Sequence, residues 1–386
     1  MNLALLVKLL ATFLTFLLIF LTRSSLAAGF SRIAKSFSEP QKNRLYQKLA
    51  TSALVSVLML IFVGAIVRVT GSGMGCPDWP TCWGLLIPPT SVEQVDFDRL
   101  PLEKFQMKAK RMGRDPASIT RESLRKEFNP RHVWTEFINR LCSLPVGIFS
   151  LATFIASFTQ RRTRPVVFWL SFAAVLLVLA NAWMGARVVY SGISPGVLTT
   201  HLAMAMLLIC VLTYCSWAGT NRPRKLEISR NAPLAKKTVV VLLIAVVIEG
   251  IMGSQIREMT DELSKTHLHS MRETWIGELE GSAIYLIHRS FSWVILFTTI
   301  FAFSTAKKNQ SGGITASQCG VLAIVLMQMA LGVIMSQIHI YSWVQVLHVG
   351  FAALLLSLVF RWFLMIPKEK SPQAEIAGDY SRIDQG

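Results

Sequence analysis

Residues 49–68 read LATSALVSVLMLIFVGAIVR, a run of twenty residues in which Arg68 is the only charged side chain. A helix of about 20 apolar residues spans the hydrocarbon core of a bilayer. Similar runs recur along the chain, and they predict further spans at 3–22, 133–158, 166–186, 198–218, 238–256, 282–304, 315–336 and 343–366. The sequence therefore predicts an all-α polytopic membrane protein.

The overall composition agrees with this class. Of the 386 residues, 52% are hydrophobic and only 16% are charged, whereas a soluble domain usually carries about 25% charged residues. The formal net charge of +17 could suggest a nucleic-acid partner, but the basic residues of membrane proteins gather in cytoplasmic loops. We therefore expect membrane lipid as a partner and no nucleic acid.

Basic residues alternate between the connecting segments. Residues 23–48 and 219–237 each carry six Lys or Arg, whereas 187–197 has one and 337–342 has none. The positive side is predicted to face the cytoplasm, which places the C-terminus there and indicates the cytoplasmic (inner) membrane. Segment 69–131 is predicted to lie outside despite ten Lys or Arg, because it also holds eight Asp or Glu and long loops largely escape the charge rule.

The first apolar run, 3–22, is open to more than one interpretation. The following SSLAA (24–28) is similar to the small-residue cleavage site of a signal peptide. However, the run lacks a basic amino-terminal region, and the six cations after it would anchor its end inside. We favour a retained extra N-terminal helix, with a signal peptide or an over-long start as the alternatives.

An internal repeat organises the eight core helices. Three matches relate its two copies: GAIVR (64–68) with GSQIR (253–257), Ile138-Asn139-Arg140 with Ile287-His288-Arg289, and Gly185 to His201 with Gly332 to His348, both 16 residues apart. Each copy holds four helices, an even number, so both copies enter the membrane from the same side, as parallel repeats do. We therefore predict two four-helix bundles side by side, with sites inside each bundle.

These predictions divide the chain into four parts. They are an N-terminal hydrophobic segment with a basic cytoplasmic linker (1–48), a first four-helix bundle (49–218) that includes the outer loop 69–131, a second bundle (238–366), and a cytoplasmic tail (367–386).

Three histidines, His201, His288 and His348, lie inside apolar helices. An ionisable residue there indicates a functional site, although a hydrogen bond between helices is the simpler alternative. His288 and His348 belong to the second and fourth helices of one copy, near the outer ends of both. Two neutral imidazoles facing each other across a bundle suit six-coordinate haem iron, whereas zinc usually takes four ligands. Arg289 is then a candidate partner for a haem propionate, or it snorkels to the interface.

The first copy departs from this pattern. Asn139 stands where the second copy has His288, and His201 remains as the counterpart of His348. Glu136 lies one turn before Asn139 on the same helix face. Arg140 is the counterpart of Arg289, and His201, Asn139 and Arg140 are the candidate residues that bind the molecule in this bundle. Asn is not a usual iron ligand, so this asymmetry suggests a permanent cofactor in the second bundle and a reacting molecule in the first.

A cysteine pair follows the first core helix in TGSGMGCPDWPTCWG (70–84). Cys76 and Cys82 lie on the predicted outer side, where disulfides persist, and the short loop between them can close. A structural staple and a reducible redox pair both remain open. The other four cysteines lie in apolar helices and are predicted to be packing residues.

Together these motifs resemble the haem A synthase family of cytochrome oxidase assembly. The matching residues are RVTGSG (68–73), the cysteine pair, EFINR (136–140), TH (200–201), IHR (287–289) and QVLH (345–348), and the resemblance covers about 48–365. The family converts haem O to haem A by oxidising a porphyrin methyl group to a formyl group. It holds a b-type haem in its C-terminal half and the substrate haem in its N-terminal half.

The resemblance implies a role for each matched residue. His288 and His348 would be the axial ligands of haem b, His201 a ligand in the substrate bundle, and Glu136 the carboxylate involved in turnover. The family usually has His at the position of Asn139, so the ligation of the substrate iron is in question. The outer loop 69–131 is also longer than the family would suggest and could form a lid or a partner site.

The implied partners are haem O and haem A, with haem O synthase and oxidase assembly factors as candidate protein partners and a homo-oligomer as a candidate assembly. Two other functions remain open. A b-type cytochrome passing electrons between quinol and an outer redox partner would explain the histidines and cysteines, but not the difference between the copies. A haem or small-molecule transporter would explain the repeat without a permanently bound haem.

Overall fold

The computed structural model describes residues 38–111, 113–192, 196–220, 223–228, 232–267, 271, 274–338 and 341–367. The predicted span 3–22 and most of the predicted tail lie outside the described residues. Eight described helices are long and apolar enough to cross a membrane, which confirms the all-α polytopic class. They are α3 (Glu39–Val69), α6 (Pro130–Ser157), α7 (Pro165–Ser191), α8 (Val197–Ala218), α9 (Ala232–Thr266), α11 (Ala283–Asn309), α12 (Ala316–Val333) and α13 (Ser342–Met365).

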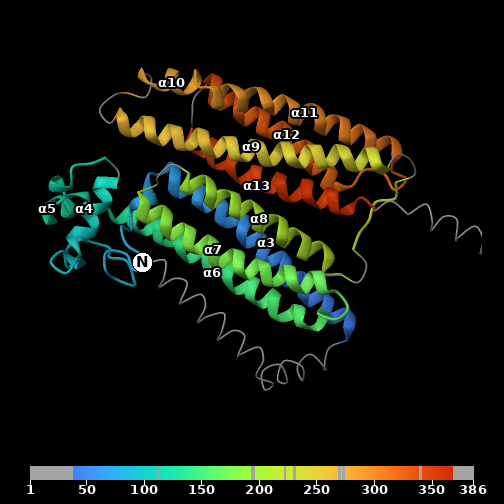
Figure 1. Ribbon diagram of the computed structural model, residues 1–386, viewed down its shortest axis with the longest axis horizontal. Helices are drawn as coiled ribbons and strands as arrows, with labels where there is room; N and C mark the ends of the chain where they lie inside the picture. Colours follow the sequence, from blue (N-terminus) through green and yellow to red (C-terminus); the bar gives the residue numbers. More distant parts are fainter. Residues whose placement is uncertain are drawn as a thin grey trace, which may run out of the picture.

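The eight helices form two groups with the same internal arrangement. In the first group α3 contacts α6 and α8, and α7 contacts the same two helices. In the second group α9 contacts α11 and α13, and α12 contacts the same two. Figure 1 shows the groups lying side by side along their length, and they meet through α3, α8, α9 and α13.

Local sequence sets where several of these helices begin and end. Pro130 and Pro165 occupy the first positions of α6 and α7, where the missing N–H of proline costs nothing. The side chain of Asn129 accepts hydrogen bonds from backbone N–H groups in the first turn of α6, as an N-cap residue does. Helix α7 ends at Ser191, and the residue that follows it, Gly192, has a φ of 69°. This is a left-handed conformation that glycine adopts without strain.

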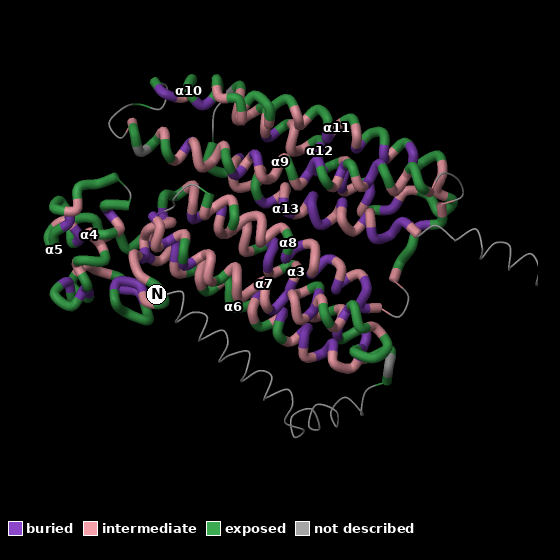
Figure 2. The backbone as a smooth tube through the Cα atoms, viewed as in Figure 1, coloured by how far each residue is buried: buried purple, intermediate pink, exposed green. Residues whose placement is uncertain are grey.

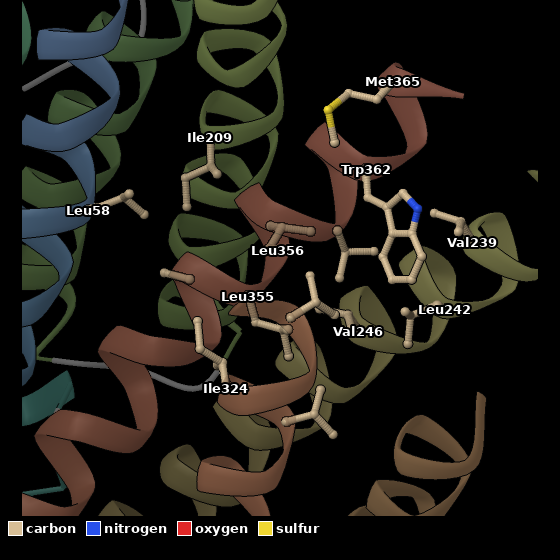
Figure 3. Packing of buried hydrophobic residues seen from close by; sticks show 14 of the residues in the cluster. Leu58, Ile209, Val239, Leu242, Val246, Ile324, Leu355, Leu356, Trp362 and Met365 are labelled. Atoms are coloured by element: carbon tan, nitrogen blue, oxygen red, sulfur yellow. The ribbon is translucent and has the colours of Figure 1, made fainter. Parts of the chain in front are cut away.

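One apolar core joins the two groups (Figure 3). Trp362 of α13 is 2% exposed and packs beside Val239 and Leu242 of α9, while Ile209 of α8 and Leu58 of α3 belong to the same cluster. Large apolar side chains also remain exposed on the long helices, among them Met59 of α3 and Phe297 of α11. Figure 2 shows exposed residues in green along the helices. Such surfaces suit lipid rather than water.

A glycine allows close contact between the first helix of one group and the last helix of the other. A Cβ placed on Gly350 of α13 would lie 2.1 Å from the ring of Phe62 on α3, so even alanine would require the ring or the helices to move. Phe62 also meets Phe351 edge to face, with ring centroids 5.6 Å apart. The two groups are therefore packed directly against each other.

The outer loop has structure of its own. It contains the short helices η1 (Ser72–Met74), η2 (Val92–Gln94), α4 (Leu102–Arg111), η3 (Pro116–Ser118) and α5 (Arg121–Glu127). Trp83 lies in a separate apolar cluster with Phe97, Leu100 and Leu124. Helices α4, α5 and α10 (Ile276–Glu280) lie at the same end of the long helices (Figure 1). The predicted outer segments thus gather at one end.

Candidate functional site

His288 and His348 face each other inside the second group. His288 lies in the second turn of α11 and His348 in the second turn of α13. Their ring centroids are 6.5 Å apart, and the ring planes are inclined by 76°. Two imidazoles bonded to one metal ion at about 2 Å would have ring centres roughly 6 Å apart. The structure therefore brings this predicted pair together at a separation that suits a shared iron.

Three intramembrane histidines have a buried ring nitrogen. The Nδ1 atoms of His201, His288 and His348 make no hydrogen bond within the described part of the chain, although Nδ1 of His288 lies within ion-pair distance of a carboxylate on α9. The side-chain oxygen of Asn139 is also buried without a partner. Buried polar atoms are nearly always paired, so such atoms at four matched repeat positions mark a site. The simpler alternative, a purely structural hydrogen bond, does not account for the Nδ1 atoms of His201 and His348 among the described residues.

Glycines flank three of the four repeat positions. A Cβ would lie 3.5 Å from His288 Cε1 if added to Gly253, 3.7 Å from His201 Cε1 if added to Gly185, and 3.8 Å from Asn139 Oδ1 if added to Gly64. The fourth, Gly332, has nothing within 4 Å and lies just before a π-helical turn, Ile334–Ile338. An added methyl group would therefore occupy the space directly beside each of these three polar groups. The donors and their surroundings therefore fit haem held by two histidines.

The sequence interpretation missed a carboxylate in the second group. Glu249 of α9 places Oε2 3.3 Å from Nδ1 of His288, and its side chain is 16% exposed. A single acid inside the apolar run 238–256 could have revealed it, because ionisable residues inside a membrane are costly. The match of Gly64 with Gly253 places Leu60 at the equivalent position in the first copy.

Glu136 lies at the end of the first group that carries α4 and α5 (Figure 1), against the cysteine loop. Its side chain is buried, and it accepts hydrogen bonds from the backbone N–H of Cys76 at 2.7 Å and from Arg140 at 2.6 Å. Arg140 also donates to the carbonyl oxygens of Thr81 at 2.9 Å, Asp78 at 3.0 Å and Cys76 at 3.2 Å. The pair thus holds the loop on α6.

Three predicted roles stay predictions. They are the catalytic role of Glu136, a substrate contact of Arg140, and a propionate contact of Arg289, whose side chain is exposed.

Cys76 and Cys82 form a disulfide, which confirms the predicted bond. Both residues are buried, with 0% and 1% of their surface exposed. The side chain of Asp78 accepts hydrogen bonds from the backbone N–H groups of Trp83 at 2.7 Å and Gly84 at 2.9 Å. A reductant can therefore reach the sulfurs only after the loop moves.

Lys108 of α4 reaches the same loop from the outer segment. Its ammonium donates to the carbonyl oxygen of Pro77 at 3.5 Å. Burial lowers the pKa of Lys108 to about 8, although the nearby carboxylates of Glu136 and Asp78 act in the opposite direction. Hydropathy could not have identified this residue, because its partners are distant in sequence.

Charged side chains join the outer ends of the two groups. Arg68 and Arg257, which match in the repeat, both pair with Asp261, the second at 3.2 Å. The pairing brings the ends of α3 and α9 together.

A second link crosses from α9 to α8. The carboxylate of Glu258 accepts hydrogen bonds from the backbone N–H groups of Gly196 at 3.0 Å and Thr199 at 2.9 Å. Gly196 is the N-cap residue of α8, so a residue of the second group caps the helix that carries His201. This position favours an anionic side chain, because the first N–H groups of a helix have no partner within it.

Comparison with known proteins gives the family. A family model described as cytochrome oxidase assembly protein matches residues 47–360. The haem A synthase of Bartonella quintana is 27% identical over 278 residues, which cover 67% of this chain and 74% of the relative. Haem A synthases of Wolbachia pipientis wMel (25% over 334 residues; 80% and 90% covered) and Shewanella oneidensis (24% over 332 residues; 78% and 91% covered) are also similar. Since the family match reaches from the first to the last of the eight helices, the chain belongs to the haem A synthase family of cytochrome oxidase assembly proteins.

Proposed function

We propose that this protein is a membrane oxidoreductase that converts haem O to haem A by oxidising a methyl group to a formyl group. The observation that carries the proposal is the difference between the two bundles. One has two facing histidines, and the other has His201 with Asn139 at the position that matches His288. A bundle with two strong ligands suits a resident cofactor, whereas a bundle with one suits a molecule that must leave.

In this proposal His288 and His348 hold haem b, which supplies one-electron transfer when bound. His201 holds the substrate from the fourth helix of the first bundle, and the small amide of Asn139 leaves the opposite side of the substrate iron without a histidine. Glu136 lies near the outer end of the same bundle, where its carboxylate would take up a proton released as the methyl group loses electrons to an external oxidant. The hydrogen bond from Arg140 orients that carboxylate toward the loop.

We further propose that the protein lies in the cytoplasmic (inner) membrane. The end of the helices that carries the Cys76–Cys82 disulfide would face away from the cytoplasm. Two features support this orientation. The segments predicted to be outer ones, including α4, α5 and α10, lie at one end of the helices (Figure 1), and the strongly basic segments connect their opposite ends. Haem O synthase and oxidase assembly factors are the proposed partners.

The test is to express the full chain in a host that makes haem O but lacks its own haem A synthase, and to extract the pigments from purified protein. The proposal expects haem A beside haem B. Haem B alone would instead support an electron-carrying cytochrome, and a chain without haem would support a transporter.

Variants then test the assigned residues. His288→Ala should abolish haem A, whereas the control His267→Ala, at the outer end of α9, should not. Glu136→Gln should retain haem B and accumulate haem O. Normal haem A production by a well-expressed Glu136→Gln protein would contradict the catalytic role.

A further inference from the structure

Glu249 is an acid inside a membrane helix for which the proposed reaction has no use. It lies near the middle of α9, in the span Ala232–Ser264. His288 is its one ion-pair partner among the described residues, at 3.3 Å from Oε2 to Nδ1. Neither of these two atoms makes a hydrogen bond elsewhere in the described part of the chain. A carboxylate at this depth is costly unless it has a function.

Structural explanations that suit other acids of α9 do not suit Glu249. Glu258 caps α8, and Asp261 pairs with two arginines at the bundle ends. Glu249 lies more than two turns deeper than either and faces no helix end. The neighbouring Gly250 packs against Met206 of α8, so this turn of α9 forms part of the wall between the bundles while Glu249 contacts His288.

The internal repeat supplies a comparison within the same chain. Leu60 occupies the equivalent position on α3, and Asn139 occupies the position of His288 on α6. At these two matched positions, the second bundle therefore has both a carboxylate and an imidazole, and the first bundle has neither. A general packing requirement of the helix pair would not couple the two positions in this way.

We propose that Glu249 is a positioning residue for the cofactor haem: its carboxylate accepts a hydrogen bond from Nδ1–H of His288, so that Nε2 faces the iron. This inference rests on the proposed haem site. A carboxylate behind a ligating histidine fixes the tautomer and the orientation of the ring and makes the ring a stronger donor. A stronger donor favours ferric over ferrous iron, and hydrogen bonding around the ligands is one of the means by which proteins set haem potentials.

The experiment compares purified full-length wild-type protein with Glu249→Gln and Glu249→Leu, the second of which copies Leu60. Glu262→Gln, an exposed acid farther along α9, is the matched control. Redox titration followed by visible spectra gives the ferric-to-ferrous equilibrium of the low-spin haem, and electron paramagnetic resonance reports the orientation of the axial rings.

We expect Glu249→Leu to shift the equilibrium toward ferrous haem by at least tenfold, which is 59 mV for one electron, and to change the resonance signal. Glu249→Gln keeps an acceptor oxygen but no charge, so it should shift the equilibrium less and keep the ring orientation. Because Gln matches Glu in size, this variant remains informative even where Leu impairs folding.

Titration and resonance signals that match wild type in both variants would overturn the role of Glu249. That result is distinct from failure of the haem site itself. If wild-type protein binds no six-coordinate haem B, or if His288→Ala retains it, then the proposed function fails. A wild-type spectrum that is normal and lost in His288→Ala, but unchanged in the Glu249 variants, defeats only this inference.

Discussion

Replacing Glu136 by Gln should loosen the disulfide loop by an amount that can be worked out from its contacts. One carboxylate oxygen accepts from Arg140 at 2.6 Å and the other from Cys76 at 2.7 Å, and the residue is 4% exposed. The amide oxygen of Gln can still accept from Cys76, but its NH₂ group would face the donors of Arg140. Breaking a buried charge pair costs about 3–5 kcal/mol. At the lower figure, the open population of the loop rises by roughly 100-fold.

The rate at which a membrane-impermeant phosphine reduces Cys76–Cys82 measures this opening, because both cysteines are buried and must be exposed before they react. Mass spectrometry of alkylated protein follows the reaction. Glu136→Gln should react about 100-fold faster than wild type at the same reductant concentration. Arg140→Gln should show a similar effect, and the double variant should be no faster than the faster single one, because the two residues form one unit.

A second pair in the outer segment provides the control. Arg114 and Glu127 lie 2.5 Å apart, but their side chains are 45% and 46% exposed. An exposed pair contributes at most about 1 kcal/mol, so Glu127→Gln should change the rate less than roughly fivefold. A Glu136→Gln rate no greater than that of Glu127→Gln would refute the reasoning, because the buried pair would then not hold the loop.

Three further predictions use other described features. His288→Ala or His348→Ala should remove the low-spin haem B spectrum from protein that still inserts in the membrane, and a full six-coordinate spectrum in either variant would contradict the ligand assignment. The double change Cys76→Ser with Cys82→Ser should lower loop stability by about 2 kcal/mol; unchanged turnover per folded molecule would favour a staple, and lost turnover a redox pair. The pKa of Lys108 is lowered from 10.5 to about 8, so burying its charged form destabilises the folded outer segment. This destabilisation is present in full below pH 8 and decreases as the pH rises toward 10.5, because the folded state loses the proton first. Limited proteolysis of the outer segment should therefore slow between pH 7.5 and 9.5, whereas Lys108→Met should show no such change beyond that of the protease itself.

The apolar runs predicted the eight long helices because burial in lipid leaves a strong signal over about 20 residues. They did not predict how far the helices extend. Helix α9 runs from Ala232 to Thr266 rather than over 238–256, and its last turns are stabilised by pairing of Arg257 with Asp261 and by Glu258 at the start of α8. Such polar support depends on tertiary contacts that hydropathy does not detect.

The candidate site likewise combines features that the sequence predicted with contacts that depend on the tertiary structure. The sequence predicted that His288 and His348 would face each other, because both lie near the same ends of the second and fourth helices of one copy. The repeat did not predict the contact of Glu249 with His288, which depends on the placement of α9 beside α11. The contact of Glu136 with Cys76 spans 60 residues, and it exists only because the loop folds back onto α6.

The cap that Glu258 provides has a consequence for how the chain can be assembled. The two repeats have the same internal arrangement, which suggests a duplicated unit that could once have worked as a pair of separate polypeptides. In the present protein the N-terminal turn of the His201 helix completes its hydrogen bonds with a side chain encoded after the midpoint of the gene. A first half made alone would lack that acceptor, so the first turn of the helix that carries His201 would be less stable until the second half is in place.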